Sequence, residues 1–169
     1  MNPCFVGERG VLLLWACDRC GLVFADRAAW KDPHAVEDYY GAGHIPLEAL
    51  RAQPTATHRE RMGFVKRWVS SGRLVDYGGG LGETAVVASR MGFAATVIED
   101  SARAVEAGKH FYPDIVWHCA RTLPDSLQDA GYDVVTAFHV MEHLLDPRKV
   151  LRQFHRVLRP GGYLCIEVP

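Results

Sequence analysis

A cluster of glycines at positions 78, 79, 80 and 82 constrains the fold of this chain more than any other feature of its sequence. Residues 73–77, which precede the cluster, form an apolar run typical of a buried strand, and residues 83–91, which follow it, are expected to form a helix. A glycine-rich turn between a strand and a helix allows a ligand to approach the backbone closely. The sequence therefore predicts a strand, turn and helix with a small-molecule site at the turn.

Strand and helix signals alternate through the rest of the chain after Thr57. Besides the strand at 73–77, apolar or β-branched runs predict strands at residues 94–99, 115–119, 132–138 and 163–168. Continuous apolar strands that alternate with helices are typical of a parallel sheet covered on both faces. We therefore expect a Rossmann-like, doubly wound α/β fold whose ligand lies at the carboxyl ends of the strands.

Capping residues and apolar spacing define the other expected helices. Thr57 and Glu60 have the spacing of a capping box at the start of the first helix. The apolar face of this helix is expected to contain Met62, Phe64, Val65, Trp68 and Val69. Ser101 is expected to cap a short helix, and Asp146 and Pro147 to begin the last one. The apolar face of the last helix is expected to contain Val150, Leu151, Phe154, Val157 and Leu158.

The spacing of the glycines argues against a dinucleotide ligand. The dinucleotide fingerprint G-x-G-x-x-G would require glycine at position 83, where this chain has Glu83. A pyrophosphate binds best at a helix N-terminus without carboxylates, yet Asp76 and Glu83 flank the turn. A ligand with a cationic end fits these carboxylates better. S-adenosylmethionine carries an ammonium and a sulfonium, and Glu99, which ends the second strand, is placed to accept its ribose hydroxyls.

Composition and charge exclude several other classes of protein. The 169 residues suffice for one compact domain with a small appendage. Lysine and arginine total 19 against 20 aspartate and glutamate, so no net positive charge is available to hold a nucleic acid. The longest apolar run, residues 11–16, is too short for a membrane span of about 20 residues or for a signal peptide. We therefore expect a cytoplasmic protein that binds neither nucleic acid nor membrane.

A local excess of basic residues surrounds the first expected helix. It contains one acidic residue, Glu60, and it is interpreted as a solvated helix face. The basic residues of this cluster are Arg51, Arg59, Arg61, Lys66, Arg67 and Arg73.

The N-terminal part of the chain lacks this regular pattern and contains cysteines with metal-ligand spacing. Cys17 and Cys20 have the spacing of half a zinc ribbon, and Cys4 would supply a third thiolate. No second cysteine pair exists around Cys4. Either His34 or His44 therefore completes a zinc site, or the metal has been lost.

Four motifs of the chain resemble those of class I S-adenosylmethionine-dependent methyltransferases. The first is LVDYGGGLG at residues 74–82, which resembles the glycine motif of the family, and the second is VIED at 97–100, which resembles the end of its second strand. The third is YDVVTAFHVMEHL at 132–144, and the fourth is RVLRPGGY at 156–163, the turn into the fifth strand. The branch of the family that this chain resembles has a cysteine-bearing N-terminal segment.

This resemblance implies where the cofactor would bind. Asp76 and the glycine turn would line its methionine and ribose side, Glu99 would hold the ribose, and Cys119 would begin the corner beside the adenine. The family often places an acidic residue near the adenine amino group, where this chain has Cys119, so backbone contacts are expected to replace that carboxylate. The expected cofactor-binding residues are Asp76, Tyr77, Gly78, Gly79, Gly80, Gly82, Glu99, Asp100, Cys119, Ala120 and Phe138.

His139, Glu142 and His143 follow the fourth expected strand, whose end faces the transferred methyl group in this fold. We expect one of them to assist deprotonation of the acceptor or to bind it, because imidazole titrates near neutral pH. A similar patch in some O-methyltransferases binds a divalent ion, but it has glutamate where this chain has His139, which disfavours a hard ion. A third interpretation is a packed and capped corner without chemistry.

Together, these features predict a methyltransferase that uses S-adenosylmethionine. Its acceptor would be an oxygen or carbon atom of a sugar, a quinone-like compound or a secondary metabolite. The alternatives are a non-catalytic S-adenosylmethionine-binding or zinc-binding interaction module and, less favoured, an NAD-dependent oxidoreductase. The expected domains are a cysteine-bearing, zinc-ribbon-like segment at residues 1–45 and a methyltransferase domain at residues 46–169.

The last expected strand would be an open edge of the sheet. The usual strand order of the family is 3-2-1-4-5, and its complete fold has two further strands, whereas this sequence stops at Pro169. The expected edge lacks the lysines and inward-pointing charges that protect such strands. It contains Tyr163, Leu164, Cys165, Ile166 and Val168. The sequence therefore predicts a C-terminally incomplete chain whose last hairpin is missing, or an edge covered by a partner chain, with aggregation or a homodimer through the fifth strand.

Overall fold

The computed structural model describes residues 2–5, 13–16, 19, 23–25 and 52–169, and the chain divides into two compact units, Met1–Tyr39 and Tyr40–Pro169. In the first unit, β1 (Asn2–Phe5), β2 (Leu13–Ala16) and β3 (Val23–Ala25) form an antiparallel sheet in that order. The expected boundary at residues 45 and 46 lies outside the described residues. Within the described ranges, no helix is long and apolar enough to cross a membrane.

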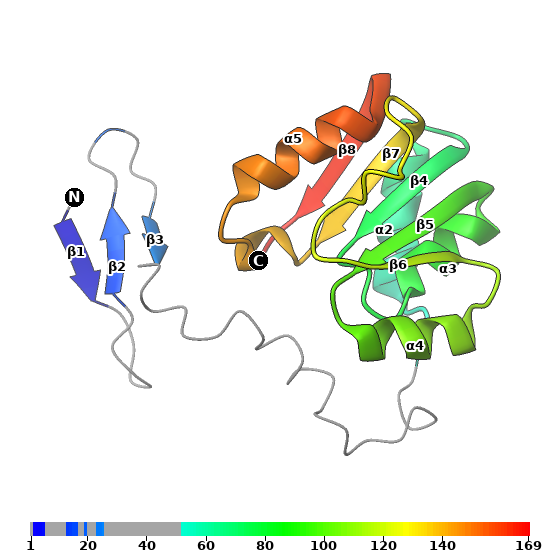
Figure 1. Cartoon of the computed structure of the whole chain (residues 1–169), viewed down its shortest axis with the longest axis horizontal. Coiled ribbons are helices and arrows are strands. Elements are labelled where there is room, and N and C mark those ends of the chain that lie inside the picture. Colours follow the sequence, from blue (N-terminus) through cyan, green and yellow to red (C-terminus); the bar gives the residue numbers. More distant parts are fainter. Residues whose placement is uncertain (1, 6–12, 17–18, 20–22, 26–51) are drawn as a thin grey trace. The chain divides into compact units, whose positions relative to one another are not determined.

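The second unit is built on a parallel sheet whose strands are β4 (Gly72–Tyr77), β5 (Phe93–Glu99), β6 (Val116–Cys119), β7 (Tyr132–Phe138) and β8 (Leu158–Glu167). Their order in space is β6-β5-β4-β7-β8, which confirms the expected order 3-2-1-4-5 (Figure 1). All neighbouring strands are parallel. The turn after the central strand β4 therefore lies at the same edge as the ends of β5 and β7.

Helices cover both faces of this sheet, as the continuous apolar strands predicted. They are α2 (Ala56–Lys66), α3 (Glu83–Arg90), α4 (Ala102–Phe111) and α5 (Pro147–Val157). Leu74 of β4 packs in one apolar cluster with residues of α2, α3 and α4, whereas the next residue, Val75, packs in a second cluster with residues of α5. In Figure 1, α2 and α5 lie on opposite sides of the sheet. Each fully buried Val, Leu or Phe in these clusters contributes about 1.5–3 kcal/mol to folding.

Two of the three expected helix caps are confirmed. The Ser101 hydroxyl accepts a hydrogen bond from the Ala104 backbone N–H, and the Asp146 carboxylate accepts one from the Lys149 N–H. The expected capping box at Thr57 and Glu60 is wrong by two residues. The cap is Thr55, whose backbone N–H donates to the His58 ring.

The first helix ends at Lys66, before Trp68 and Val69, which were expected on its apolar face. Met62, Val65 and Val69 are buried as expected, whereas Phe64 and Trp68 are not. These two side chains are 51% and 61% exposed. They line a groove of about 290 Å³ between α2 and β8, together with Tyr163, Leu164, Cys165 and others. The apolar spacing therefore continues around the helix beyond the side chains that the sheet buries, and the groove beside β8 leaves Phe64 and Trp68 exposed.

The transition from α5 to β8 also differs from the expectation. The helix ends at Val157, and the strand begins at Leu158, well before the expected start at residue 163. A register shift between Tyr132 and Val134 accommodates the Pro-Gly-Gly sequence within the pairing of β7 and β8. Leu151, which was expected on the buried face of α5, is exposed. In the described sheet β8 is the last strand beside β7, and Tyr163, Leu164, Ile166 and Val168 near its end are exposed.

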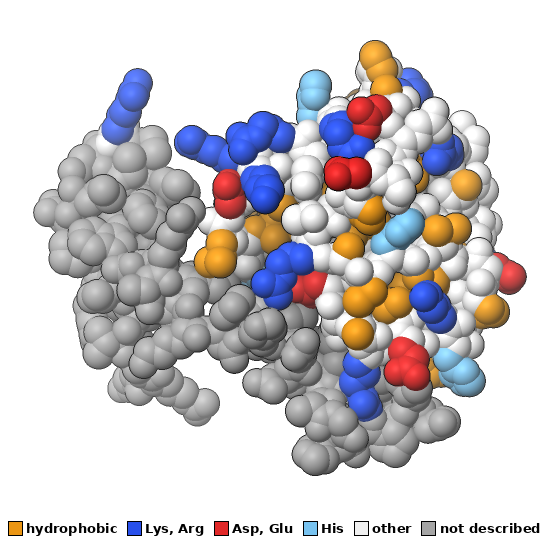
Figure 2. Space-filling view, viewed as in Figure 1, with side chains coloured by type: hydrophobic (Ala, Val, Ile, Leu, Met, Phe, Trp, Pro, Cys, Tyr) orange, Lys and Arg blue, Asp and Glu red, His pale blue; other side chains and the backbone are white. Residues whose placement is uncertain are grey.

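Charged side chains of both signs share the surface. Figure 2 shows lysine and arginine side chains gathered over α5, where Arg148, Lys149 and Arg152 are exposed, with acidic side chains beside them. Arg156 on the same helix forms an ion pair with Asp129. This face therefore carries mixed charge, in agreement with the net charge of -1 of the whole chain.

Candidate functional site

The glycine turn between β4 and α3 adopts backbone conformations that favour glycine. Gly78, Gly80 and Gly82 have φ angles of 69°, 56° and 86°. A Cβ atom at Gly78 would lie 2.6 Å from a methyl group of Val140, and one at Gly82 would lie 2.6 Å from the Trp117 ring. The turn is therefore sterically specified, and Gly78, Gly79 and Gly80 at its start are partly exposed.

Asp76, the last acidic residue before this turn, is a buried carboxylate with one free oxygen. The Thr136 hydroxyl donates to its Oδ1 at 2.7 Å, whereas Oδ2 is buried without a hydrogen-bond partner. Burial raises the pKa of Asp76 to about 7, and the nearby carboxylates of Glu99 and Glu83 contribute to this rise, while the Thr136 hydrogen bond opposes it. Such an oxygen is suited to accept a cationic hydrogen-bond donor.

Glu99 lies on the other side of the turn, at the end of β5. The backbone N–H of Gly80 donates to its Oε2 and the N–H of Ser101 to its Oε1, each at 2.9 Å. Burial raises the pKa of Glu99, while these backbone N–H groups oppose the rise. Each carboxylate oxygen retains a second lone pair, so Glu99 can accept ligand hydroxyls while it holds the turn.

We expect Glu99→Ala to weaken the binding of S-adenosylhomocysteine by about 1.5–3 kcal/mol, the value of hydrogen bonds to a charged group. Calorimetric titration measures this loss. Glu106→Ala is the matched control, because Glu106 is an exposed glutamate on α4, and this variant should bind like the parent. Equal affinities for all three proteins would remove Glu99 from the site.

The side chain of Tyr77 points away from the turn and into the core. Its ring packs edge-on against Phe154, with ring centroids 5.1 Å apart, and its hydroxyl donates to the Arg121 backbone carbonyl at 2.7 Å. Burial raises the pKa of Tyr77 to about 12. Asp100 forms an ion pair with Arg121, with 3.3 Å between Oδ2 and Nε. Tyr77 and Asp100 were both expected at the cofactor site, and the side chain of Asp100 is partly exposed whereas that of Tyr77 is buried.

The remaining expected cofactor residues lie at the ends of β6 and β7. Cys119 is an exposed free thiol, and the backbone N–H of Ala120 donates to the Glu99 carbonyl at 2.9 Å. Phe138 lies under the guanidinium of Arg61, 5.0 Å from ring centroid to Cζ. The topology therefore brings every expected cofactor residue to the carboxyl ends of β4, β5, β6 and β7.

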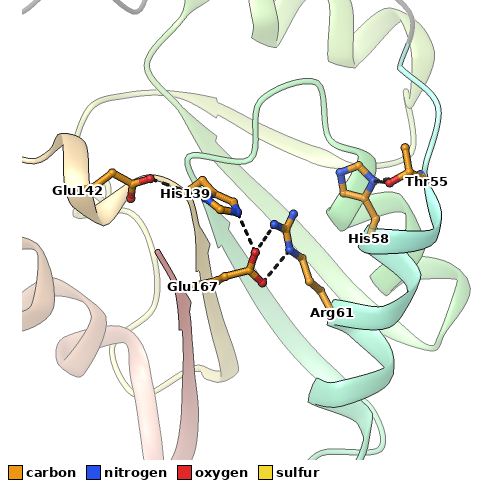
Figure 3. Close-up of polar contacts among 6 residues, drawn as sticks. All are labelled: Thr55, His58, Arg61, His139, Glu142 and Glu167. Atoms are coloured by element: carbon orange, nitrogen blue, oxygen red, sulfur yellow. Dashed lines mark hydrogen bonds and ion pairs between the residues drawn. The ribbon is translucent and has the colours of Figure 1, made fainter. Parts of the chain in front are cut away.

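His139, Glu142 and His143 form a group of titratable side chains directly after β7, with the last two in a short 3-10 helix, η3 (Met141–His143). His139 Nε2 lies 2.8 Å from Glu167 Oε1, and its Nδ1 lies 3.8 Å from Glu142 Oε1 (Figure 3). The same Glu142 oxygen lies 3.8 Å from His143 Nε2. Glu142 Oε2 is buried without a hydrogen-bond partner. The three expected residues thus lie together at this edge of the sheet.

Arg61 of α2 extends this group from the opposite side, which corrects its interpretation as part of a solvated basic face. Its side chain is only 15% exposed, and it binds both carboxylate oxygens of Glu167, with 3.0 Å between Nε and Oε2 (Figure 3). The Arg61 guanidinium holds the pKa of Glu167 below its ordinary value. A buried charge needs such a partner, because desolvation of an unpaired guanidinium is costly.

Sequence reasoning did not identify Thr136, Arg61 or Glu167 as site residues. Thr136 lies within a β-branched strand, where its type is explained by packing alone. Arg61 and Glu167 are 106 residues apart in the sequence, and only the topology brings them together. A threonine within an otherwise apolar strand and a glutamate at the end of the fifth strand were the available signals, and neither is specific.

The expected zinc ligands lie largely beyond the described residues. Cys17 and Cys20 are outside them, and Cys4 lies in β1, where only the backbone is described. Among the side chains that the structure describes, no group of three or more His, Cys, Asp or Glu residues is arranged to hold a metal ion. Zinc binding by these cysteines therefore stays a prediction.

Comparison with known proteins gives a family match over most of the chain. A family model described as a methyltransferase domain matches residues 49–169, which include all five strands of the parallel sheet. The matched range also contains the glycine turn and the three residues His139, Glu142 and His143, which we call the His139 group.

Two curated bacterial enzymes are similar in sequence. The ubiquinone biosynthesis O-methyltransferase of Caulobacter vibrioides is 34% identical over 148 residues, which are 82% of this chain and 57% of that protein. The ubiquinone/menaquinone biosynthesis C-methyltransferase UbiE of Rubrivivax gelatinosus is 34% identical over 98 residues, which are 56% of this chain and 38% of that protein. The chain thus spans about half the length of the curated relatives that it matches.

A solved structure shares the fold at lower identity. The Haemonchus contortus phosphoethanolamine N-methyltransferase 2 in complex with S-adenosylhomocysteine superposes with a TM-score of 0.54 at 22% identity. The match covers 63% of this chain and 27% of that one. The likeness supports the arrangement of strands and helices described above.

Proposed function

This chain belongs to the class I S-adenosylmethionine-dependent methyltransferases, and from that membership we propose that it transfers a methyl group from S-adenosylmethionine to an oxygen or carbon atom of a small molecule. Relatives named as O-methyltransferase and C-methyltransferase of ubiquinone biosynthesis support both kinds of acceptor atom. A quinone-like compound, a sugar or a secondary metabolite remains the proposed acceptor class.

The observation that carries the proposal is the free, buried Oδ2 of Asp76 beside the glycine turn. An unpartnered buried oxygen is costly, and a cationic donor of a ligand would relieve that cost. A Cβ atom at Gly79 would lie 2.9 Å from this oxygen, so only glycine leaves the space open. The ammonium of S-adenosylmethionine suits this oxygen, while Glu99 suits the ribose. When bound, S-adenosylmethionine supplies an electrophilic methyl group.

Positioning of the methyl donor and acceptor should account for most of the rate enhancement in such a site. Alignment of two reactants lowers the activation barrier by about 7–11 kcal/mol. A general base raises the rate by a factor of about 10² to 10⁴. Asp76 and Glu99 would align the donor, and the His139 group would receive the proton of the acceptor. We propose His139, Glu142 and His143 as the residues that face the acceptor.

We expect His139→Ala and His143→Ala to lower turnover and to leave the affinity for S-adenosylhomocysteine within about threefold, which is about 0.7 kcal/mol. The reason is that these side chains would act on the acceptor and not on the cofactor. His155→Ala is the control, since His155 is an exposed histidine on α5. If both variants turn over like the parent, the group is a packed corner without chemistry.

Transfer of a labelled methyl group tests the proposal itself. The protein is incubated with methyl-labelled S-adenosylmethionine and a panel of phenols, enolisable quinone precursors and sugars, and label in each acceptor is measured by mass spectrometry. We expect transfer to at least one oxygen or carbon acceptor. Binding of S-adenosylmethionine without transfer to any panel member would favour the non-catalytic alternative.

For the N-terminal segment, we propose that Cys4, Cys17 and Cys20 bind zinc. Structural zinc contributes about 10–16 kcal/mol of apparent binding free energy in peptides, so three thiolates with a histidine or water as fourth ligand would retain the metal. Elemental analysis after purification without chelators should find zinc in the parent and less in Cys17→Ser. Cys165→Ser is the control, because Cys165 packs against the core of the second unit. Absence of zinc from the parent would refute this proposal.

A further inference from the structure

His139 is held in an unusual backbone conformation by a single residue of the neighbouring strand. Its φ angle is 53°, a left-handed backbone conformation that residues other than glycine rarely adopt. The His139 backbone N–H donates to the Glu167 carbonyl at 2.8 Å, and the His139 ring contacts the carboxylate of the same residue. Such strained residues persist only where the surrounding structure fixes them, and they are concentrated at functional sites.

Glu167 is in turn fixed by α2. Arg61 contacts both oxygens of the carboxylate, so Glu167 cannot rotate without losing an ion pair (Figure 3). Arg61 itself is largely buried and stacks on Phe138, the residue before His139. Three elements, α2, β7 and β8, thus converge on the His139 ring.

This arrangement determines which ring nitrogen carries a proton. The Arg61 guanidinium lowers the pKa of Glu167, so its carboxylate is ionised and can only accept hydrogen bonds. His139 Nε2 must therefore donate to Glu167 Oε1. In the neutral ring the lone pair then lies on Nδ1. Glu142 Oε1 is 3.8 Å from that nitrogen, too far for a hydrogen bond that would occupy it.

We propose that Glu167, held by Arg61, is a positioning residue that fixes the Nε2–H tautomer of His139 and leaves Nδ1 free to take the proton of the methyl acceptor. This inference rests on the proposed function. Glu142 of η3 also lies beside the ring, and His143 contacts Glu142 in turn. Both carboxylates would stabilise the imidazolium that proton uptake creates.

The step is balanced without a further reactant. The acceptor O–H or C–H bond breaks, its proton binds His139 Nδ1, and its electron pair forms the new bond to the methyl carbon. The bond between that carbon and sulfur breaks with its electron pair on sulfur, which leaves a neutral thioether. The positive charge of the sulfonium is thereby lost, and an equal charge appears on His139 between Glu167 and Glu142.

A double substitution, Arg61→Met with Glu167→Met, separates positioning from folding. The Arg61 side chain is largely buried, whereas that of Glu167 is 39% exposed. Replacing both partners leaves no unpaired charge, so the variant should fold. The ring of His139 would lose its acceptor, and we expect turnover to fall about 100-fold, as for a small misplacement of a reacting group. Affinity for S-adenosylhomocysteine should stay within about threefold of the parent.

The tautomer of His139 can be determined without a methyl acceptor and without a measurement of enzymatic activity. Long-range proton–nitrogen NMR correlations of the imidazole rings, assigned with His139→Ala, should show only the Nε2–H form for neutral His139 in the parent. The double variant should show both tautomers. Glu167→Gln keeps the side-chain volume and serves if the double variant does not fold, because its amide both donates and accepts and no longer dictates one tautomer.

Loss of a different ion pair controls for changes in stability. Arg156→Met with Asp129→Met removes an arginine–carboxylate pair beside α5, and its His139 signals and turnover should match the parent. An Nδ1–H ring in the parent, or a double variant with parental tautomer and turnover, would overturn the inference. If the parent neither binds S-adenosylhomocysteine nor transfers methyl groups, the proposed function fails, while the NMR comparison still decides whether Glu167 fixes the tautomer.

Discussion

Replacement of Gly80 by valine is expected to weaken the binding of S-adenosylhomocysteine at least about 100-fold, or about 2.7 kcal/mol. The φ angle of Gly80 is 56°, a conformation that a β-branched residue adopts only under strain. The Gly80 N–H also donates to Glu99 at 2.9 Å, so a distorted turn would displace the carboxylate proposed to hold the ribose. Calorimetric titration of the folded variant measures the effect.

The control for this variant is the same substitution at Gly63. Gly63 lies in α2, and a Cβ atom there would meet no atom within 4 Å. Gly63→Val should therefore fold and bind S-adenosylhomocysteine like the parent. Gly80→Ala, which removes the branching, should lie between the parent and Gly80→Val. Full affinity of Gly80→Val would show that the ligand does not approach this turn.

Asp76→Asn should change the pH dependence of stability in the protein without cofactor. The pKa of Asp76 is raised to about 7 by burial, from an ordinary 3.8 in the unfolded chain. Between these values the unfolded state has lost its proton and the folded state has kept it, so the stability of the folded state falls as pH rises. The pKa difference corresponds to about 4 kcal/mol lost between pH 4 and pH 8.

The amide that Asp76→Asn introduces does not titrate, so this loss should be absent from the variant. Urea unfolding at pH 5 and pH 8 measures it: parental stability should drop markedly toward pH 8, and that of the variant much less. Thr136→Val is a useful second variant, because it removes the hydrogen bond that favours the charged form of Asp76. An equal pH dependence in the parent and in Asp76→Asn would show that Asp76 is already ionised at pH 5.

The same substitution should impair cofactor binding, even where it stabilises the protein. The ammonium of S-adenosylhomocysteine favours ionised Asp76, so binding near pH 7 should release about half a proton in the parent. Calorimetry in two buffers of different ionisation enthalpy measures this release. Asp76→Asn should show weaker binding and a smaller proton release. If Asp76→Asn released as many protons as the parent, the protons would come from another group.

Much of the fold could be predicted, because the relevant signals are local. The β-branched run at 132–138 became β7 without a change of bounds, and the caps Ser101 and Asp146 begin α4 and α5 as expected. The strand order followed from the resemblance to the family. The glycine spacing located the turn, since its positive φ angles leave few alternatives to glycine.

The errors concern properties that depend on tertiary contacts. Phe64 and Trp68 have the helical spacing of core residues, but a groove separates them from β8, so both side chains stay exposed. Arg61 has the composition of a solvated face, yet its partner Glu167 lies on a strand at the other end of the sequence. A sequence pattern states which residues share a face of an element, and it does not state what covers that face.

The most direct test of this account is a calorimetric titration of the same protein with S-adenosylmethionine, S-adenosylhomocysteine and NAD. The free oxygen of Asp76, the carboxylate of Glu99 and the glutamate at position 83 all favour a cationic ligand over a pyrophosphate. We expect both S-adenosyl ligands to bind and NAD to bind more weakly or not at all. NAD binding with equal or greater affinity would contradict the assignment of this site.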